Sequence, residues 1–284
     1  MNYKREFVFV GKGIVSLSAA LVAAGVLFLP GKGMAAPNGQ VTLTDQGSSA
    51  AVDLGSMAGM YNWSVNGQNQ LKQQWFWYSI GSGAPQAINT IGLTGVDQVS
   101  ASEVSATYQN AQLALTIDYQ LSGGGVGSGS ADITESISAV NISGGSLGFH
   151  FYQYSDFNLL GDGSSDTVQL FGNPGTWNFV QQTAGSSGIG EAVVAPSANH
   201  GEAAFVGQTL AELNGSSPLT LNDNPSAGPG DVTWALEWDT TLNPGGTFDL
   251  TKDKSLFIQV VPEPSTVALI ALGLGAWGLA RRRQ

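Results

Sequence analysis

Glu237 and Asp239 are two acidic residues whose spacing could support chemistry. They stand in the segment VTWALEWD, where apolar residues alternate with others as in a half-buried β-strand. A glycosidase uses two carboxyl groups that flank the bond it cleaves. The pair is therefore the candidate catalytic set of a polysaccharide hydrolase. Because both residues are expected on one face of one strand, solvent-facing charge is the competing interpretation.

A second acidic group, in the segment LLGDGSSDTV, has the ligand chemistry of a calcium site. Asp162, Ser164 and Asp166 offer oxygen atoms at alternate positions around a glycine, and calcium prefers hard oxygen ligands. The segment lacks the later bidentate glutamate of an EF-hand loop. The sequence leaves two interpretations open, a calcium site and a polar turn. Calcium is the one cofactor that the residues suggest.

Other catalytic and metal-binding patterns have little support. The chain has no cysteine, which excludes zinc–thiolate sites and thiol nucleophiles. The two histidines, His150 and His200, have no metal-ligand partner at helical spacing. Ser146 lies in GGSLG, but the G-x-S-x-G pattern requires a strand-to-helix elbow, and a turn is predicted here. We therefore expect a protein without enzymatic activity.

The segment QQWFWYSI is unusually rich in aromatic residues. Alternation places Trp75 and Trp77 on one face of a strand and Phe76 and Tyr78 on the other. One face is expected to pack in the core, and the other, if exposed, could stack on sugar rings. The two tryptophans are thus candidate glycan contacts, with core packing as the alternative.

Alternation with a period of two recurs along the body and predicts many short strands. In residues 111–121 the odd positions are apolar, and turn signals such as Asn66-Gly67 separate one strand from the next. This pattern is typical of an all-β protein, an antiparallel β-sandwich, for which we expect jelly-roll-like connectivity. A short helix is predicted at residues 207–215, and the glycine-rich residues 122–130 predict a long hairpin loop.

Residues 1–35 predict a secretory signal peptide with a signal helix. Lys4 and Arg5 precede an uncharged apolar run from Ile14 to Leu29, and small residues follow it. Cleavage between Ala35 and Ala36 fits the preference for small residues at the cut. An uncleaved membrane anchor is the alternative, because an apolar run of 16 residues is nearly long enough to span a bilayer.

The C-terminal segment, residues 262–284, follows the predicted β-sandwich domain at residues 36–261 and contains three features in order. They are Pro262, Glu263 and Pro264, then an uncharged run from Thr266 to Ala280, then Arg281, Arg282 and Arg283. As a helix the run would be about 22 Å long, enough to cross a locally thinned membrane. The positive-inside rule places the arginines in the cytoplasm and the body outside the inner membrane.

These three features resemble the PEP-CTERM sorting signal of Gram-negative bacteria. The resemblance implies that exosortase, a membrane peptidase, processes a tail-anchored intermediate and that the protein then reaches the cell surface or the extracellular matrix of a biofilm. A simple tail anchor is the alternative. In the body, FYQYSDFNLLGDGSSD and GDVTWALEWDTTLNPGGTF are similar to an uncharacterised β-rich group in the same family.

Charge excludes one class of partner. Residues 36–261 contain three lysines and 19 acidic residues, a formal net charge of −16, which would repel the phosphates of a nucleic acid. We expect an exported, non-enzymatic protein with a structural or glycan-binding role that associates with exopolysaccharide. A secreted polysaccharide-acting hydrolase and a calcium-stabilised adhesin are the alternatives.

Overall fold

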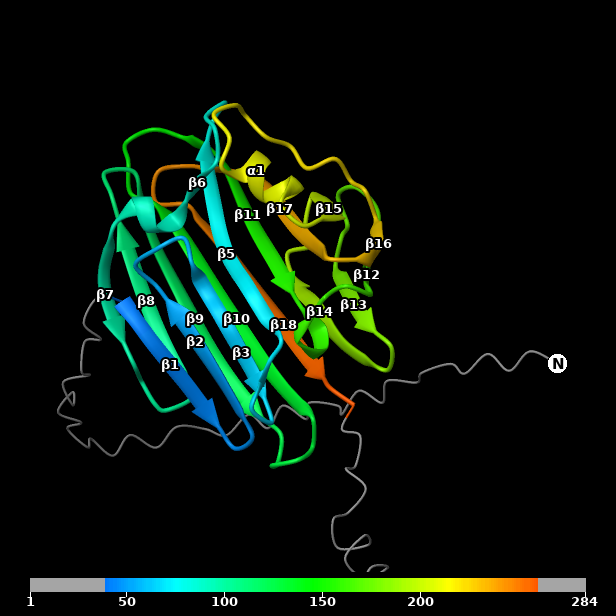
Figure 1. The fold of residues 1–284 in the computed structure, drawn as a ribbon. Coiled ribbons are helices and arrows are strands. Elements are labelled where there is room, and N and C mark those ends of the chain that lie inside the picture. Colours follow the sequence, from blue (N-terminus) through cyan, green and yellow to red (C-terminus); the bar gives the residue numbers. More distant parts are fainter. Residues whose placement is uncertain (1–38, 260–284) are drawn as a thin grey trace, which may run out of the picture. The chain divides into compact units, whose positions relative to one another are not determined.

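The computed structural model describes residues 39–259, which form two β-sheets packed face to face (Figure 1). The front sheet of Figure 1 has the order β1-β2-β3-β5-β11-β17-β15, and the short strands β4 and β6 pair with β3 and β5. The back sheet has the order β16-β12-β13-β14-β18-β10-β9-β8-β7. The front strands are β1 (Gln40–Asp45), β2 (Ser48–Asp53), β3 (Gly59–Val65), β4 (Gln68–Asn69), β5 (Leu71–Ile80), β6 (Gln86–Ala87), β11 (Leu147–Phe157), β15 (His200–Phe205) and β17 (Val232–Leu242). The back strands are β7 (Leu93–Asp97), β8 (Glu103–Gln109), β9 (Leu113–Gly123), β10 (Ser130–Asn141), β12 (Asp166–Phe171), β13 (Phe179–Ala184), β14 (Ser187–Ala195), β16 (Ser226–Gly230) and β18 (Thr247–Phe257).

The predicted all-β antiparallel sandwich is confirmed. All pairings are antiparallel within residues 39–259 except a short parallel contact between β3 and β5, where Gly59 and Met60 lie beside Gln74. The jelly-roll connectivity was wrong. A jelly roll has eight strands in two Greek keys, whereas each of the two sheets within residues 39–259 has nine strands. The physical reason is that short turns join many consecutive strands into meanders such as β7-β8-β9-β10 and β12-β13-β14.

Local predictions agree with the observed elements. In β9 the odd positions from Leu113 to Leu121 are buried, as the alternation predicts. The glycine-rich loop joins β9 to β10 as a hairpin. The single α-helix of residues 39–259 is α1 (Gln208–Leu213), at the predicted place, and two 3₁₀ helices, η2 (Ile88–Ile91) and η3 (Leu159–Gly161), are short connections.

The space between the sheets is filled by aromatic side chains. Phe149 and Phe151 of β11 pack on Phe248 of β18, with ring centroids 5.7 Å and 5.8 Å apart. Aromatic rings contribute large buried areas and a geometric preference for tilted contacts. These contacts define the inner face of the front sheet. The even-numbered residues of β11 therefore lie on its outer face.

A buried ionic quartet lies among these apolar residues. The Nζ atoms of Lys252 and Lys254 each lie 2.6 Å from an oxygen of Glu135, and 3.5 Å and 3.8 Å from oxygens of Glu191. Gln153 from the front sheet accepts a hydrogen bond from Lys252 and donates one of 2.6 Å to Glu191. All four charged side chains are at most 1% exposed. Burial is tolerated because the four charges sum to zero and each lies close to groups of opposite charge.

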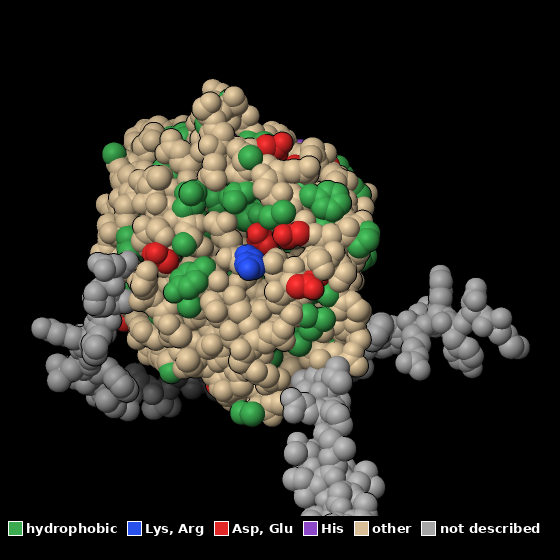
Figure 2. Space-filling view, viewed as in Figure 1, with side chains coloured by type: hydrophobic (Ala, Val, Ile, Leu, Met, Phe, Trp, Pro, Cys, Tyr) green, Lys and Arg blue, Asp and Glu red, His purple; other side chains and the backbone are tan. Residues whose placement is uncertain are grey.

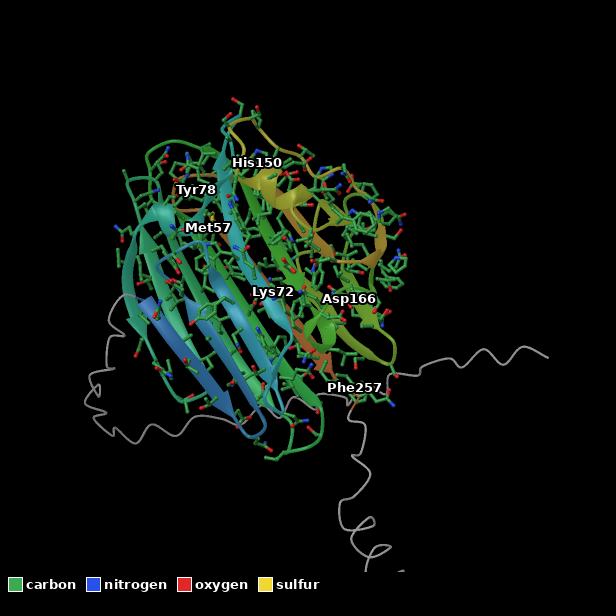
Figure 3. All side chains as sticks on the ribbon, viewed as in Figure 1. Met57, Lys72, Tyr78, His150, Asp166 and Phe257 are labelled. Carbon is green, nitrogen blue, oxygen red and sulfur yellow. The ribbon has the colours of Figure 1, made fainter. Side chains whose placement is uncertain are left out.

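The buried quartet carries no net charge, and it leaves one lysine on the described surface. Of the three lysines in the described residues, Lys72 alone is exposed. Figure 2 views the front of the molecule and shows acidic side chains beside one cationic group, close to where Figure 3 labels Lys72. Because the quartet removes two positive and two negative charges together, its burial leaves the net negative charge of the described surface unchanged.

The outer face of the front sheet is covered near β5, β11 and β17. Residues 207–225, which include α1 and which we call the covering segment, lie across it, and Figure 1 shows α1 in front of β17. The Nε1 of Trp77 donates a 3.2 Å hydrogen bond to Asn214, and the hydroxyl of Tyr152 donates one of 2.9 Å to the carbonyl of Leu219. Both faces of the central strands are consequently buried.

Within residues 39–259, no helix has the length and apolar character needed to cross a bilayer. The predicted signal helix, the cleavage between Ala35 and Ala36, and the C-terminal transmembrane helix lie outside the described residues. So do the predicted sorting residues Pro262, Glu263, Pro264, Arg281, Arg282 and Arg283.

Candidate functional site

Both histidines of the chain lie on the outer face of the front sheet, beside the acidic pair of β17. The strand register places His150 of β11 opposite Asp239, and His200 of β15 opposite Glu237. Directly opposed residues of antiparallel strands project to the same face. Asp223, from the covering segment, completes the group through a hydrogen bond to His200. We call these five residues the His–carboxylate cluster; Figure 3 labels His150 at one end of β11.

Distances within the cluster are short. The Nδ1 of His150 is hydrogen-bonded to Oδ1 of Asp239 and lies 4.0 Å from Oε1 of Glu237. The Nε2 of His200 lies 3.6 Å from Oδ2 of Asp239. The side chains of His150, His200 and Asp239 are each about 30% exposed, whereas Glu237 is 0% exposed. Glu237 thus lies at the buried floor of the cluster, and the other three side chains form a rim that solvent reaches.

Glu237 has two oxygens in different environments. Oε2 accepts a 2.7 Å hydrogen bond from the backbone N–H of Leu221. Oε1 is buried and has no hydrogen-bond partner among the described residues. Burial raises the pKa of Glu237 to about 7, the N–H of Leu221 opposes the shift, and the charge of Asp239 adds to it.

His200 is held by a chain of hydrogen bonds. Its Nδ1 lies 2.9 Å from Oδ2 of Asp223, whose Oδ1 accepts bonds of 2.8 Å from Nε1 of Trp177 and 3.1 Å from the N–H of Gly201. Burial lowers the pKa of His200, but the hydrogen bond and charge of Asp223 outweigh it, so the pKa is raised. Asp223 itself has φ +61°, a backbone conformation that costs energy in a residue other than glycine.

The structure changes the interpretation of the acidic pair. Glu237 and Asp239 share a face of β17, as predicted, but the expectation of solvent-facing charge is wrong for Glu237 because the covering segment buries it. The histidines were not connected to this pair at the sequence level. His150 and Asp239 are 89 positions apart, and only the register of three strands brings them together. The alternation around His150 was the one available signal, since it placed this polar residue in a strand.

Trp75 and Trp77 lie on one face of β5, the outer face, and both are 0% exposed. Trp77 is covered by the segment that contains Asn214. Neither ring is available to stack on a sugar in this structure. The alternative of core packing describes their surroundings.

Asp162, Ser164 and Asp166 occupy two different environments. Asp162 is exposed, and its Oδ1 accepts bonds of 2.7 Å and 2.9 Å from the N–H and hydroxyl of Ser164. Asp166 is 1% exposed, and its Oδ2 accepts bonds from the N–H of Leu159 and the amide of Gln182. Asp162 and Ser164 therefore form a polar turn, whereas Asp166 binds the first residue of η3 through the N–H of Leu159.

Ser146 lies in the turn between β10 and β11 and its hydroxyl donates to Asn243 at 2.9 Å. The expected turn is confirmed, and no helix follows this serine, since β11 begins at the next residue.

Comparison with known proteins identifies the end of the chain. Residues 260–284 match the family model described as the PEP-CTERM protein-sorting motif, so the resemblance seen in the sequence is confirmed. The motif marks an exported protein that is sorted to the cell envelope or surface, and it implies processing by exosortase. No curated protein matches the chain.

The body resembles solved structures through its fold. A putative aldose 1-epimerase from Escherichia coli K12 has a TM-score of 0.52 at 10% identity, over 78% of this chain and 99% of that chain. A bacterial glucoamylase, solved in complex with acarbose, has a TM-score of 0.53 at 13% identity, over 85% of this chain and 36% of that chain. The chain therefore spans about a third of the glucoamylase. Identities this low show a common β-sandwich fold alone.

Proposed function

We propose that the protein is sorted by exosortase to the cell surface or extracellular matrix, and that its β-sandwich binds carbohydrate there without transforming it. The observation that carries the proposal is the match of residues 260–284 to the PEP-CTERM sorting motif. The predicted signal peptide at residues 1–35 supplies the export step. The acidic surface argues for a neutral or cation-bridged polysaccharide as partner instead of a polyanion.

The His–carboxylate cluster is the place in the body where carbohydrate would bind. His150, His200 and Asp239 form a partly exposed polar rim, and imidazole and carboxylate groups hydrogen-bond sugar hydroxyls. The fold shared with a glucoamylase solved with acarbose is consistent with a sugar-binding body. That support concerns the architecture, since the two sequences share 13% identity.

The sorting step is tested by replacing Glu263 with alanine in the native host and following the protein in membrane, surface and extracellular fractions. We expect the E263A chain to accumulate in the inner-membrane fraction. Replacing Glu103, an acidic residue on β8, gives a matched control that should sort normally. Equal distributions of E263A and wild type would remove exosortase from the proposal.

The binding step is tested with exopolysaccharide prepared from the same host. H200A and D239N should weaken retention on the immobilised polysaccharide at least tenfold, because each removes a hydrogen-bonding group from the rim. D97N, which changes the same charge on the exposed end of β7, should bind like wild type. Equal retention of all variants would show that the His–carboxylate cluster does not bind the polysaccharide.

A hydrolase that uses Glu237 and Asp239 is the second candidate. The two residues lie two positions apart on β17 and project to the same side, whereas a glycosidase needs carboxyl groups on both sides of the scissile bond. For this reason we assign them to binding. Release of reducing sugar by wild type, lost in both E237Q and D239N, would instead make the protein an enzyme.

A further inference from the structure

We propose that His150, His200, Glu237 and Asp239 bind one divalent transition-metal ion of the zinc class. The inference does not depend on carbohydrate binding, because it concerns the ligand chemistry of the four side chains. One ligand atom from each of His150, Glu237 and Asp239 lies within 4.8 Å of the others. His200 is not one of these three residues, but its Nε2 lies 3.6 Å from Oδ2 of Asp239.

The buried oxygen of Glu237 is the first argument. Oε1 has no hydrogen-bond partner among residues 39–259, on a side chain that is 0% exposed, and it lies 4.0 Å from Nδ1 of His150. A buried carboxylate oxygen without a partner is costly. A cation between Oε1 and Nδ1 would remove this cost, and it would take the place of the hydrogen bond between His150 and Asp239.

The orientation of His200 is the second argument. Its Nδ1 is engaged by Asp223, which is itself held by Trp177 and Gly201. In a neutral imidazole whose Nδ1 donates to a carboxylate, Nε2 carries the lone pair, and here Nε2 lies 3.6 Å from Asp239. Histidine ligands of metals commonly donate their other ring N–H to a carboxylate in this way, which fixes the tautomer and the ring orientation. Asp223 adopts a costly positive φ of 61° in this position.

The donor set selects the class of metal. Two imidazoles and two carboxylates suit zinc and its first-row neighbours, which accept four ligands at about 2.0–2.2 Å. Calcium requires six to eight oxygen ligands, and this cluster offers too few. The rigid part of the site comes from three paired strands, β11, β17 and β15, and the partly exposed rim allows the ion to enter.

Calorimetry on the full-length chain, purified in detergent without a polyhistidine tag and stripped with a chelator, tests the proposal. Titration with zinc chloride is expected to show one site per chain, and calcium chloride should give no binding. Zinc should also raise the melting temperature of the wild-type chain. Cobalt as a second probe should give visible absorption bands that zinc displaces.

Variants distinguish this cluster from an adventitious surface site. H150A and H200A should each lower zinc affinity by about a hundredfold or more, and D223N by about 10–100-fold, because Asp223 acts through His200. D97N should bind like wild type. Near-ultraviolet circular dichroism checks folding, and His200, at 29% exposed, provides a test even if H150A does not fold.

Two outcomes would overturn the proposal: a folded wild-type chain that takes up no zinc, and zinc binding that survives in both histidine variants. Polysaccharide retention measured with stripped and zinc-loaded protein separates the two proposals. Zinc binding without polysaccharide binding would leave the metal site standing and refute the carbohydrate role. Polysaccharide retention by a chain that binds no zinc would support the carbohydrate role and refute the metal site.

Discussion

Asp156 illustrates how the environment of one residue sets a response to pH. It lies on β11, is 9% exposed, and has Asp231 and Asp166 as acidic neighbours and Lys72 as the cation that acts on it. Burial raises the pKa of Asp156 to about 7, the charge of Asp231 adds to the shift, and Lys72 opposes it. Between about pH 4 and about pH 7, the carboxyl group of Asp156 is therefore protonated in the folded protein and ionised in the unfolded chain.

The contribution of Asp156 to the stability of the folded protein should consequently fall as the pH rises from about 4 to about 7, because the folded state binds the extra proton in that window. The total effect of Asp156 is at most about 4 kcal/mol, at about 1.4 kcal/mol per unit of pKa. D156N should flatten this dependence, and D118N, on β9 of the back sheet, should keep it. Urea unfolding at several pH values measures both. An unchanged slope in D156N would contradict the assignment.

The buried quartet makes a second prediction at this scale. Burial opposes ionisation of Glu135, but Lys252 and Lys254 outweigh it and lower its pKa, so the carboxylate stays charged. K252M leaves that charge with one ammonium group fewer, and losing one partner of a buried pair costs about 3–5 kcal/mol. We expect the free energy of unfolding to fall by that amount.

The double variant K252M/E135L removes one positive and one negative charge together. It should recover part of the lost stability, because Lys254 and Glu191 remain as a neutral pair. Denaturant unfolding of the single and double variants measures the difference. A double variant less stable than K252M would show that the quartet contributes through other contacts.

At the scale of elements, the short parallel contact between β3 and β5 depends on a glycine. Gly59 has φ +58°, and a Cβ atom there would lie 2.4 Å from the carbonyl oxygen of Gln74 and 2.5 Å from the ring of Trp75. The two strands can approach in parallel at this point because no side chain separates them.

G59A should therefore destabilise the protein by at least about 3 kcal/mol, since it combines backbone strain with a clash that the backbone must relieve. Gly67 is the matched control: its φ is +81°, but a Cβ there meets nothing within 4 Å. G67A should cost only the strain, about 1–2 kcal/mol. Thermal unfolding of both variants separates the cost of the steric clash from the cost of backbone strain. Equal losses of stability in G59A and G67A would exclude a steric role for Gly59.

The covering segment shapes the site in two ways. It converts a face that a β-sandwich commonly leaves to solvent into a second buried layer, through bonds to Trp77, Tyr152 and Glu237. It also supplies Asp223, which orients His200. The chemistry of the cluster is therefore set jointly by sheet register and by one connecting segment.

At the scale of the whole molecule, the exposure of each lysine to solvent can be measured by chemical labelling. Lys72 is exposed, whereas Lys252 and Lys254 lie between the sheets. An amine-reactive reagent should label Lys72 at least tenfold faster than the other two in the native protein, and all three equally in urea. Peptide mass mapping gives the rates. Fast native labelling of Lys252 would contradict the buried quartet.

The sequence by itself determined the architecture and the sorting signal. Alternating apolar residues, as in β9, specify strands because side chains of a strand project to opposite faces with a period of two. Turn residues, the short helix α1 and the C-terminal motif are equally local, since each depends on neighbouring residues alone. Local patterns are readable without knowledge of what packs against them.

Only the tertiary structure decided which face of each strand was covered and which distant residues met. The alternation of β17 gave two faces but could not show that the covering segment buries Glu237. Nor could it pair His150 with Asp239, because strand register is fixed by the packing of whole sheets. Burial of Lys252 and Lys254 likewise required Glu135 and Glu191 from other strands. Charge, burial and proximity depend on long-range contacts, which spacing along the chain does not specify.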